Sequence, residues 1–141
     1  MIRMAVFFIL ISVFILTIVC PVGYAGMNTA AIANPASVNC IKKGGTLSIQ
    51  KRGDGGEYGV CIFEDNRQCE EWAMFRGECP IGGVKIAGYA TPAARICVIT
   101  GGTYKVSGNN NTDNEQGTCT FKKGAVCDAW DYFNGKCLRT D

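Results

Sequence analysis

One cysteine-rich stretch occurs twice in this sequence. Residues 59–79 read GVCIFEDNRQCEEWAMFRGEC, and residues 117–137 read GTCTFKKGAVCDAWDYFNGKC. The cysteines, glycines, phenylalanines and tryptophan that the two stretches share coincide at a constant offset, which is typical of a duplicated structural unit. We therefore predict a leader followed by two copies of one module. The predicted boundaries are a signal peptide at 1–25, a spacer at 26–33, a first module at 34–80, a linker at 81–89 and a second module at 90–141.

Cysteine usage indicates how such small modules are stabilised. A unit of about fifty residues buries too little apolar surface to be stable without a further constraint. The chain has nine cysteines and no histidine, which favours disulfide bonds formed in an oxidising compartment. Loss of Cys20 with the leader would leave an even number of cysteines. The predicted disulfide cysteines are Cys40, Cys61, Cys69, Cys79, Cys97, Cys119, Cys127 and Cys137.

The first 25 residues have the layout of a secretory signal peptide. Arg3 precedes an apolar run at residues 5–19, and the small residues Gly23 and Ala25 follow it. This order of a cation, an apolar segment and small residues predicts cleavage after Ala25. The mature protein is therefore expected to be secreted, periplasmic or on the surface of a microbial cell.

Two other fates of the leader stay open. Residues 4–22 would nearly span a bilayer core as a helix, so an uncleaved leader would anchor the protein in the membrane. Lipidation of Cys20 is the third possibility, although the residues before it lack the small side chain that lipoprotein signals use.

Local patterns predict an α+β fold in which each module reads helix, strand, strand, helix. In the first module, Asn34-Pro35 opens a helix that Gly44-Gly45 ends. Alternating apolar residues predict strands at 46–50 and 57–63, joined as a β-hairpin. A short helix follows at 69–76. The second module repeats this order.

Packing expectations follow from the apolar residues. Trp72 and Phe75 are three residues apart on the short helix, which predicts that Trp72 packs on the hairpin, with an exposed binding platform as the alternative. Trp130 has the corresponding place in the second module. Ile81, Val84 and Ile86 make the linker too apolar for a solvated tether, so the two modules are expected to contact each other.

The residue types exclude several kinds of chemistry. Without histidine, a serine or cysteine nucleophile lacks its usual base, and the cysteine spacing has no C-x2-C metal-binding pair. Glu70 and Glu71 are adjacent in the short helix and point about 100° apart, so helix capping is favoured over acid–base catalysis. The formal net charge of +2 is too small to attract nucleic acid. We predict no catalytic residue, no metal, no cofactor and no enzymatic activity.

The first repeat resembles the domain-of-unknown-function family numbered 333. The resemblance rests on NPASVNC at 34–40, GGEYGVC at 55–61, EEW at 70–72 and RG at 76–77. It implies an exported microbial protein, and members of this family often carry a haemolysin label. The second repeat matches less well, because Asp128-Ala129 replaces the paired glutamates and Asn134 stands where Arg76 is.

The resemblance also implies a disulfide pairing. Four cysteines in one module allow three pairings, and their spacing does not select among them. Shorter members of the family keep only the counterparts of Cys40 and Cys61. This implies that Cys40 pairs with Cys61 and Cys69 with Cys79.

These observations favour an exported tandem-repeat binding module of the cell envelope or exterior. The candidate binding residues are Glu70, Glu71, Trp72 and Arg76. The expected partner is a protein or a cell-envelope component, without insertion of the mature chain into a membrane. One alternative is a membrane-active, haemolysin-like protein, although the mature chain has neither a long amphipathic helix nor a cationic excess. Another is a structural subunit of a surface layer or sheath, because hairpins leave strand edges that pair between chains.

Overall fold

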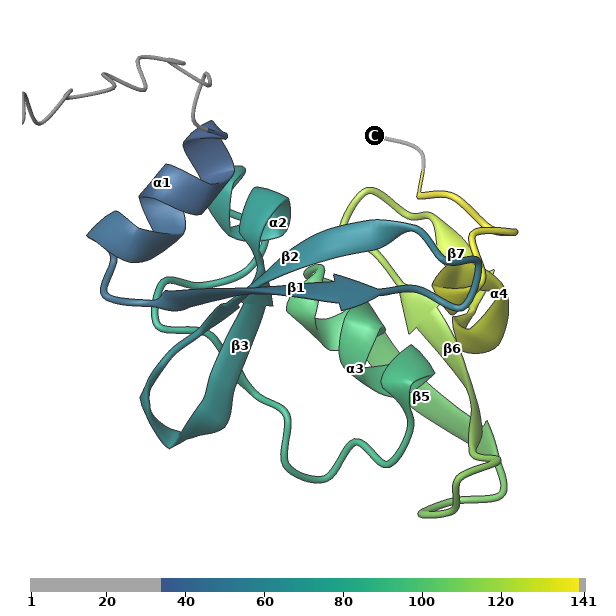
Figure 1. Ribbon diagram of the computed structural model, residues 1–141. Helices are drawn as coiled ribbons and strands as arrows, with labels where there is room; N and C mark the ends of the chain where they lie inside the picture. Colours follow the sequence, from purple (N-terminus) through teal and green to yellow (C-terminus); the bar gives the residue numbers. More distant parts are fainter. Residues whose placement is uncertain (1–33, 140–141) are drawn as a thin grey trace, which may run out of the picture. The chain divides into compact units, whose positions relative to one another are not determined.

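The computed structural model describes residues 34–139, which form an α+β unit built from two repeats (Figure 1). The predicted signal peptide and spacer lie outside the described residues. The first repeat contains α1 (Pro35–Lys42), β1 (Thr46–Lys51), β2 (Glu57–Ile62), the 3-10 turn η1 (Glu64–Asn66), β3 (Arg67–Glu70) and α2 (Glu71–Phe75), and β4 (Val84–Lys85) follows it. The second repeat contains α3 (Pro92–Ile99), β5 (Thr103–Gly108), β6 (Gln116–Thr120), β7 (Val126–Asp128) and α4 (Ala129–Phe133).

Each repeat has its own antiparallel sheet. The strand order is β1-β2-β3-β4 in the first repeat and β5-β6-β7 in the second. The predicted hairpins are confirmed, but each repeat has a third strand that the sequence did not predict. Cys69 and Glu70 pair with β2 in that strand, so the short helix begins at Glu71 rather than at Cys69. Strands of four and three residues are too short to show an alternating pattern.

Local capping residues set the limits of the longer helices. The Asn34 side chain accepts a hydrogen bond from the Ala36 N–H, and the Thr91 hydroxyl accepts one from the Ala94 N–H. Each helix has proline in its first turn. Just beyond each helix, a glycine adopts the left-handed conformation that ends it, with φ 84° at Gly44. The predicted helix starts and ends are therefore confirmed.

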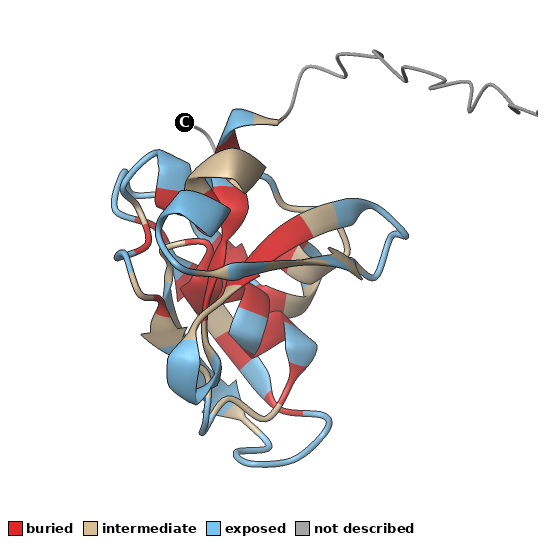
Figure 2. Cartoon of the chain, turned by 60° about the vertical axis from the view of Figure 1, so that its left-hand side comes forward, coloured by how far each residue is buried: buried red, intermediate tan, exposed pale blue. Residues whose placement is uncertain are grey.

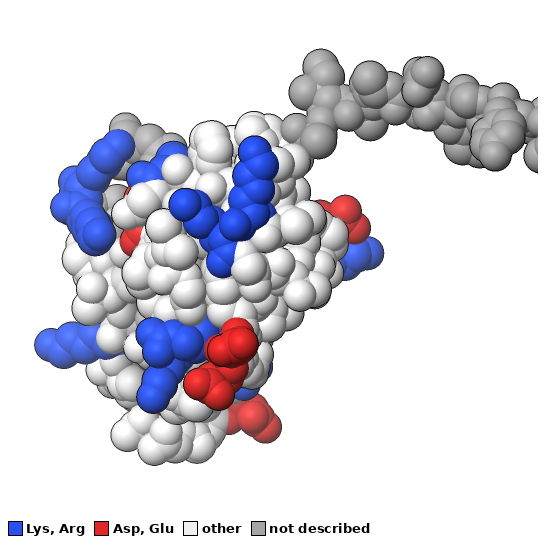
Figure 3. All heavy atoms as spheres, turned by 90° about the vertical axis from the view of Figure 1, so that its left-hand side faces the viewer, with Lys and Arg blue, Asp and Glu red and all other residues white. Residues whose placement is uncertain are grey.

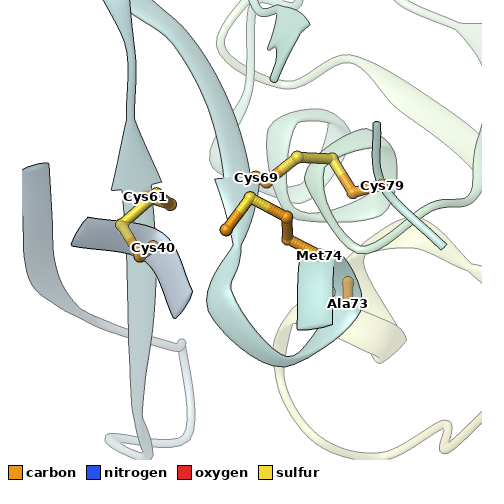
Figure 4. Packing of buried hydrophobic residues seen from close by; sticks show 6 residues of the cluster. All are labelled: Cys40, Cys61, Cys69, Ala73, Met74 and Cys79. Carbon is orange, nitrogen blue, oxygen red and sulfur yellow. A yellow bond between two sulfur atoms is a disulfide. The ribbon is translucent and has the colours of Figure 1, made fainter. Parts of the chain in front are cut away.

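Two disulfides join the elements of each repeat in the same way. In the first repeat, Cys40 of α1 bonds to Cys61 of β2, and Cys69 of β3 bonds to Cys79 after α2 (Figure 4). This is the pairing that the family resemblance implied. The second repeat has the equivalent bonds, Cys97–Cys119 and Cys127–Cys137. Such a set of disulfides indicates an oxidising compartment.

The two repeats share a hydrophobic core. Each repeat has a cluster around its own disulfides, and a third cluster joins them through Val60 of β2 and Val98 and Ile99 of α3. Val84 and Ile86 of the predicted linker pack against this third cluster. The predicted contact between modules is thus confirmed, although Ile81 is exposed. Figure 2 shows the buried residues at the centre and exposed residues along the outer loops.

The β1–β2 hairpin of the first repeat reaches across to α4 of the second (Figure 1). At its tip, Arg52 Nη2 donates to the Tyr132 carbonyl (3.2 Å) and the Gly53 N–H donates to the Phe133 carbonyl (3.2 Å). A Cβ on Gly135 would lie 2.1 Å from Asp54 Oδ2, so the hairpin turn and the end of α4 meet closely. The Gly53 N–H satisfies the Phe133 carbonyl, which the end of α4 leaves without an intrahelical partner, and Arg52 adds a second donor to the Tyr132 carbonyl, which also accepts from the Gly135 N–H.

The packing expected for Trp72 is wrong. Trp72 and Phe75 are 38% and 49% exposed, while Ala73 and Met74 of the same helix are buried. Successive helical residues point about 100° apart. Because Ala73 and Met74 pack beside the Cys69–Cys79 bond (Figure 4), Trp72 turns outward, where its ring meets that of Phe75 edge-on.

Candidate functional site

A cleft between the two repeats gathers three of the four predicted binding residues. Its volume is about 240 Å³. The first repeat contributes Arg52, Tyr58, Glu70, Trp72 and Arg76. The second contributes Ile96, Thr100, Tyr132 and Arg139. Neither repeat alone would form this site.

Glu70 caps the helix that carries Trp72. Its carboxylate oxygens accept hydrogen bonds from the N–H groups of Trp72 (3.0 Å) and Ala73 (2.7 Å). Burial raises the pKa of Glu70, although these two hydrogen bonds and the charge of Arg76 act in the opposite direction. Asp128 caps α4 in the same manner. Glu70 therefore has the capping role that the sequence favoured and also lines the cleft.

Glu71 points away from the cleft and joins α2 to α1. Its side chain accepts hydrogen bonds from Asn34 Nδ2 (2.9 Å) and from the Ser37 hydroxyl (2.5 Å), and the residue is 5% exposed. A Cβ on Gly59 would lie 2.4 Å from the Glu71 Cδ. This carboxylate thus occupies a fitted, buried position, and the structure gives it a structural contact rather than a place in the cleft.

Two arginines on opposite sides of the repeat boundary share one carboxylate. Arg76 Nη2 and Arg139 Nη1 lie 3.0 Å and 2.7 Å from the same oxygen, Glu78 Oε2. Arg139 Nη1 also donates to the Thr100 carbonyl (3.1 Å). Two cation–π contacts lie nearby, Arg52 on the Tyr132 ring and Arg139 on the Phe121 ring.

Arg52 forms the cationic end of the cleft. Its guanidinium carbon lies 5.0 Å from the centre of the Tyr132 ring, and its Nε is buried without a hydrogen-bond partner. Burial raises the pKa of Tyr132, against the effect of its hydrogen bond to Thr100, and burial likewise raises the pKa of Tyr58. Both phenols therefore stay neutral near pH 7, where they provide hydroxyl groups and aromatic surface.

The sequence could not locate the other residues of this cleft. Arg52 lies in a hairpin turn, Tyr132 on the last helix and Arg139 near the end of the described residues. These positions come together only because the two repeats pack on each other. The duplicated motif drew attention to Glu70, Trp72 and Arg76, whereas no motif marks the other three.

The cleft combines positive charge with aromatic surface. Three guanidinium groups, those of Arg52, Arg76 and Arg139, line the cleft with the Glu70 carboxylate, and Arg76 and Arg139 also contact Glu78. Guanidinium groups bind carboxylates and phosphates in a fixed, often bidentate geometry. This arrangement is suited to binding an anionic group beside an apolar or ring-shaped one.

Residues 34–139 contain neither a metal-binding cluster nor a membrane-spanning helix. Within this range, no group of three or more cysteine, aspartate or glutamate side chains is placed to hold a metal ion. No helix in the same range has the length and apolar character needed to cross a membrane.

Comparison with known proteins identifies the family. Residues 31–78 and 88–136 each match the family model described as "Domain of unknown function (DUF333)". The uncharacterized protein YdbJ of Escherichia coli strain K12, and that of strain O6:H1 CFT073, are each 30% identical over 50 residues. The match covers 36% of this chain and 57% of each relative, so the chain spans little more than half of their length. No solved structure matches. These relatives give no support to the haemolysin label. The two matches to the family model show that the protein belongs to the DUF333 family and contains two tandem copies of its domain.

Proposed function

We propose that the protein is an exported, non-enzymatic binding module of the cell envelope or exterior. Its ligand, a protein or an envelope component, is held in the cleft between the repeats. The observation that carries this proposal is the joint construction of the cleft, in which Arg76 and Arg139 from different repeats meet at Glu78. The duplication thereby gains a binding surface that one repeat lacks.

Export is supported by the disulfides and by the predicted leader. Four disulfides require an oxidising compartment, and residues 1–25 have the layout of a cleaved signal peptide. Cleavage gives a secreted or periplasmic protein, whereas a retained leader gives the same binding module anchored at the membrane.

The two alternative functions lack a specific supporting observation. On the face that carries α1, lysine and arginine side chains form separate groups with acidic side chains among them (Figure 3). Membrane damage by electrostatic adsorption would be favoured by a continuous cationic surface. A surface-layer or sheath subunit stays an alternative on the basis of its strand edges alone.

The proposal is tested by comparing two exposed apolar residues. The mature protein is immobilised and used to capture partners from the envelope fraction, next to the variants Trp72→Ala and Ile41→Ala. Trp72 lines the cleft, whereas Ile41 is 64% exposed on α1. We expect the same partner to be retained by the parent protein and by Ile41→Ala, and to be lost from Trp72→Ala.

Equal capture by both variants would remove the cleft from the proposal. Turnover of an envelope substrate by the purified protein, abolished by one side-chain change in the cleft, would show an enzyme instead.

A further inference from the structure

A second, smaller hollow continues the cleft along the second repeat. It is lined by Glu78, Thr100, Phe121, Lys122, Lys123 and Arg139. Thr100 and Arg139 also line the cleft, so the two sites adjoin. The small hollow and the cleft together are named the basic groove below.

The basic groove concentrates the positive charge of the protein. It has five cationic side chains, Arg52, Arg76, Arg139, Lys122 and Lys123, against the two carboxylates of Glu70 and Glu78. That excess of three exceeds the formal net charge of +2 that the whole sequence carries. Lys122 and Lys123 are exposed in the turn between β6 and β7. A groove lined by several cations matches a ligand with more than one negative charge along its length.

The size and the walls of the cleft indicate what one unit of that ligand is. A volume of about 240 Å³ is below the roughly 300–1,000 Å³ of sites for drug-sized ligands, so the cleft accommodates one ring-sized unit. Trp72 presents an exposed aromatic surface, and Tyr58 and Tyr132 add hydroxyl groups. Aromatic surface packs against the C–H face of a sugar ring, and hydroxyl groups bond to its oxygens.

An extended peptide would use different features. Peptides gain affinity by pairing their backbone with a free strand edge or by laying a helix in an apolar groove. The side chains that line the basic groove come from α2, α3, α4 and the flanking turns, with Tyr58 of β2 and Glu70 at the end of β3, and its charge is high. These features favour a charged sugar polymer over a peptide.

We infer that the basic groove binds an acidic polysaccharide, with one sugar ring in the cleft beside Trp72 and its carboxylate or phosphate groups among Arg76, Arg139, Lys122 and Lys123. Arg76 engages Glu78 through Nε and Nη2, which leaves its other donors for the ligand. This inference rests on the proposed binding function and names the chemical class of its ligand.

The test uses defined probes and two lysine pairs. Binding is measured by calorimetry, at two salt concentrations, with oligogalacturonate, a phosphorylated manno-oligosaccharide, a neutral malto-oligosaccharide and oligoglutamate. The variant Lys122→Ala/Lys123→Ala is compared with Lys42→Ala/Lys43→Ala, an equally exposed pair at the end of α1. Both variants lose the same charge, so only position distinguishes them.

We expect a charged saccharide to bind and the neutral one to fail. The Lys122/Lys123 variant is expected to lose about fivefold in affinity and part of the salt dependence, and the Lys42/Lys43 variant less than about twofold. Trp72→Ala is expected to lose about tenfold. Oligogalacturonate and the phosphorylated manno-oligosaccharide distinguish a carboxylate ligand from a phosphate ligand, and binding of either supports the inference.

Three results would overturn the inference: equal losses for the two lysine pairs, equal binding of the neutral saccharide, or tighter binding of oligoglutamate. Absence of saccharide binding while Trp72→Ala still abolishes capture of an envelope partner would refute the polysaccharide and leave the proposed function standing. Absence of both effects would refute both.

Discussion

Replacement of Glu71 by alanine is the most informative test of how the first repeat is held together. The Glu71 carboxylate is buried and accepts hydrogen bonds from Asn34 and Ser37 of α1. Glu71→Ala removes this acceptor and leaves both donors without it. The second repeat shows a related arrangement without the carboxylate, because Thr91, Ala94 and Ala129 stand at the three equivalent positions.

The expected loss of stability follows from those two contacts. A hydrogen bond to a charged group contributes about 1.5–3 kcal/mol, and the lower value is appropriate because Asn34 and Ser37 are only partly buried. The carboxylate also lies in the first turn of α2, where it interacts with the helix dipole for about 0.5 kcal/mol. We expect Glu71→Ala to lower the free energy of unfolding by about 3.5 kcal/mol, which combines two such hydrogen bonds with the dipole contribution.

Urea denaturation with intact disulfides measures this change. Glu57→Ala is the matched control, because Glu57 is exposed at the start of β2 and its loss is expected to cost less than about 0.5 kcal/mol. Combining Glu71→Ala with Gly59→Ala adds a second criterion. A Cβ at Gly59 collides with the carboxylate, so Gly59→Ala should be less costly once Glu71 is alanine, with a coupling of about 1 kcal/mol or more. A Glu71→Ala loss no larger than that of the control would refute the reasoning.

Three further predictions concern pH and reduction. Burial raises the pKa of Glu70, so its protonated form adds stability that is present below its ordinary pKa of 4.5 and is lost as pH rises through the folded-state pKa. In urea denaturation, the parent protein should therefore lose stability relative to Glu70→Gln between acidic and neutral pH. A stability difference that stays constant over this range would contradict the prediction. Burial and the hydrogen bond to Glu115 raise the pKa of Tyr104 to about 12, so the free energy of unfolding should fall as pH rises from 10 towards 12. Tyr104→Phe should remove this fall, and absorbance titration of the phenolate measures the pKa. Mild reduction should open Cys127–Cys137 first, because Cys137 is partly exposed whereas every other bridging cysteine is at most 2% exposed. Alkylation and mass spectrometry follow the order of opening, and earlier opening of Cys40–Cys61 would contradict this prediction.

Much of the fold could be predicted because its signals are local. Asn34-Pro35 caps a helix and Gly44 ends it through contacts with neighbouring residues. The hairpins follow from alternating residues, and the cysteine count indicates disulfides. The third strand was missed because it depends on pairing across the sheet, with Cys69 opposite Cys61, and four residues carry too little pattern to show it.

The candidate site was predictable only in part, for the same physical reason. Trp72 and Arg76 belong to the repeated motif and do line the cleft. Glu71 belongs to the same motif, yet its contacts with α1 are tertiary and direct it away from the cleft. Arg52 and Arg139 contribute to the site through packing between repeats, and a sequence read one repeat at a time contains no signal for such packing.

The packing between repeats also explains why the second copy departs from the family pattern. Helix α3 buries Val98 and Ile99 against Val60 of the first repeat. When Cys97 is aligned with Cys40, the equivalent residues of α1 are Ile41 and Lys42, and both are exposed. The two copies therefore meet head to tail, because α3 forms the interface while its counterpart α1 faces solvent.

A head-to-tail interface could in principle be extended by a further copy. At the equivalent position of the second repeat, the polar residue Thr118 stands where the first repeat has Val60. The free helix at the other end carries Lys42 in place of Ile99. Polar end faces of this kind limit a repeat array. Divergence between the copies thus gives α3 the apolar face that packs on the first repeat, and in this arrangement Arg139 and Arg76 meet at Glu78, where the cleft forms.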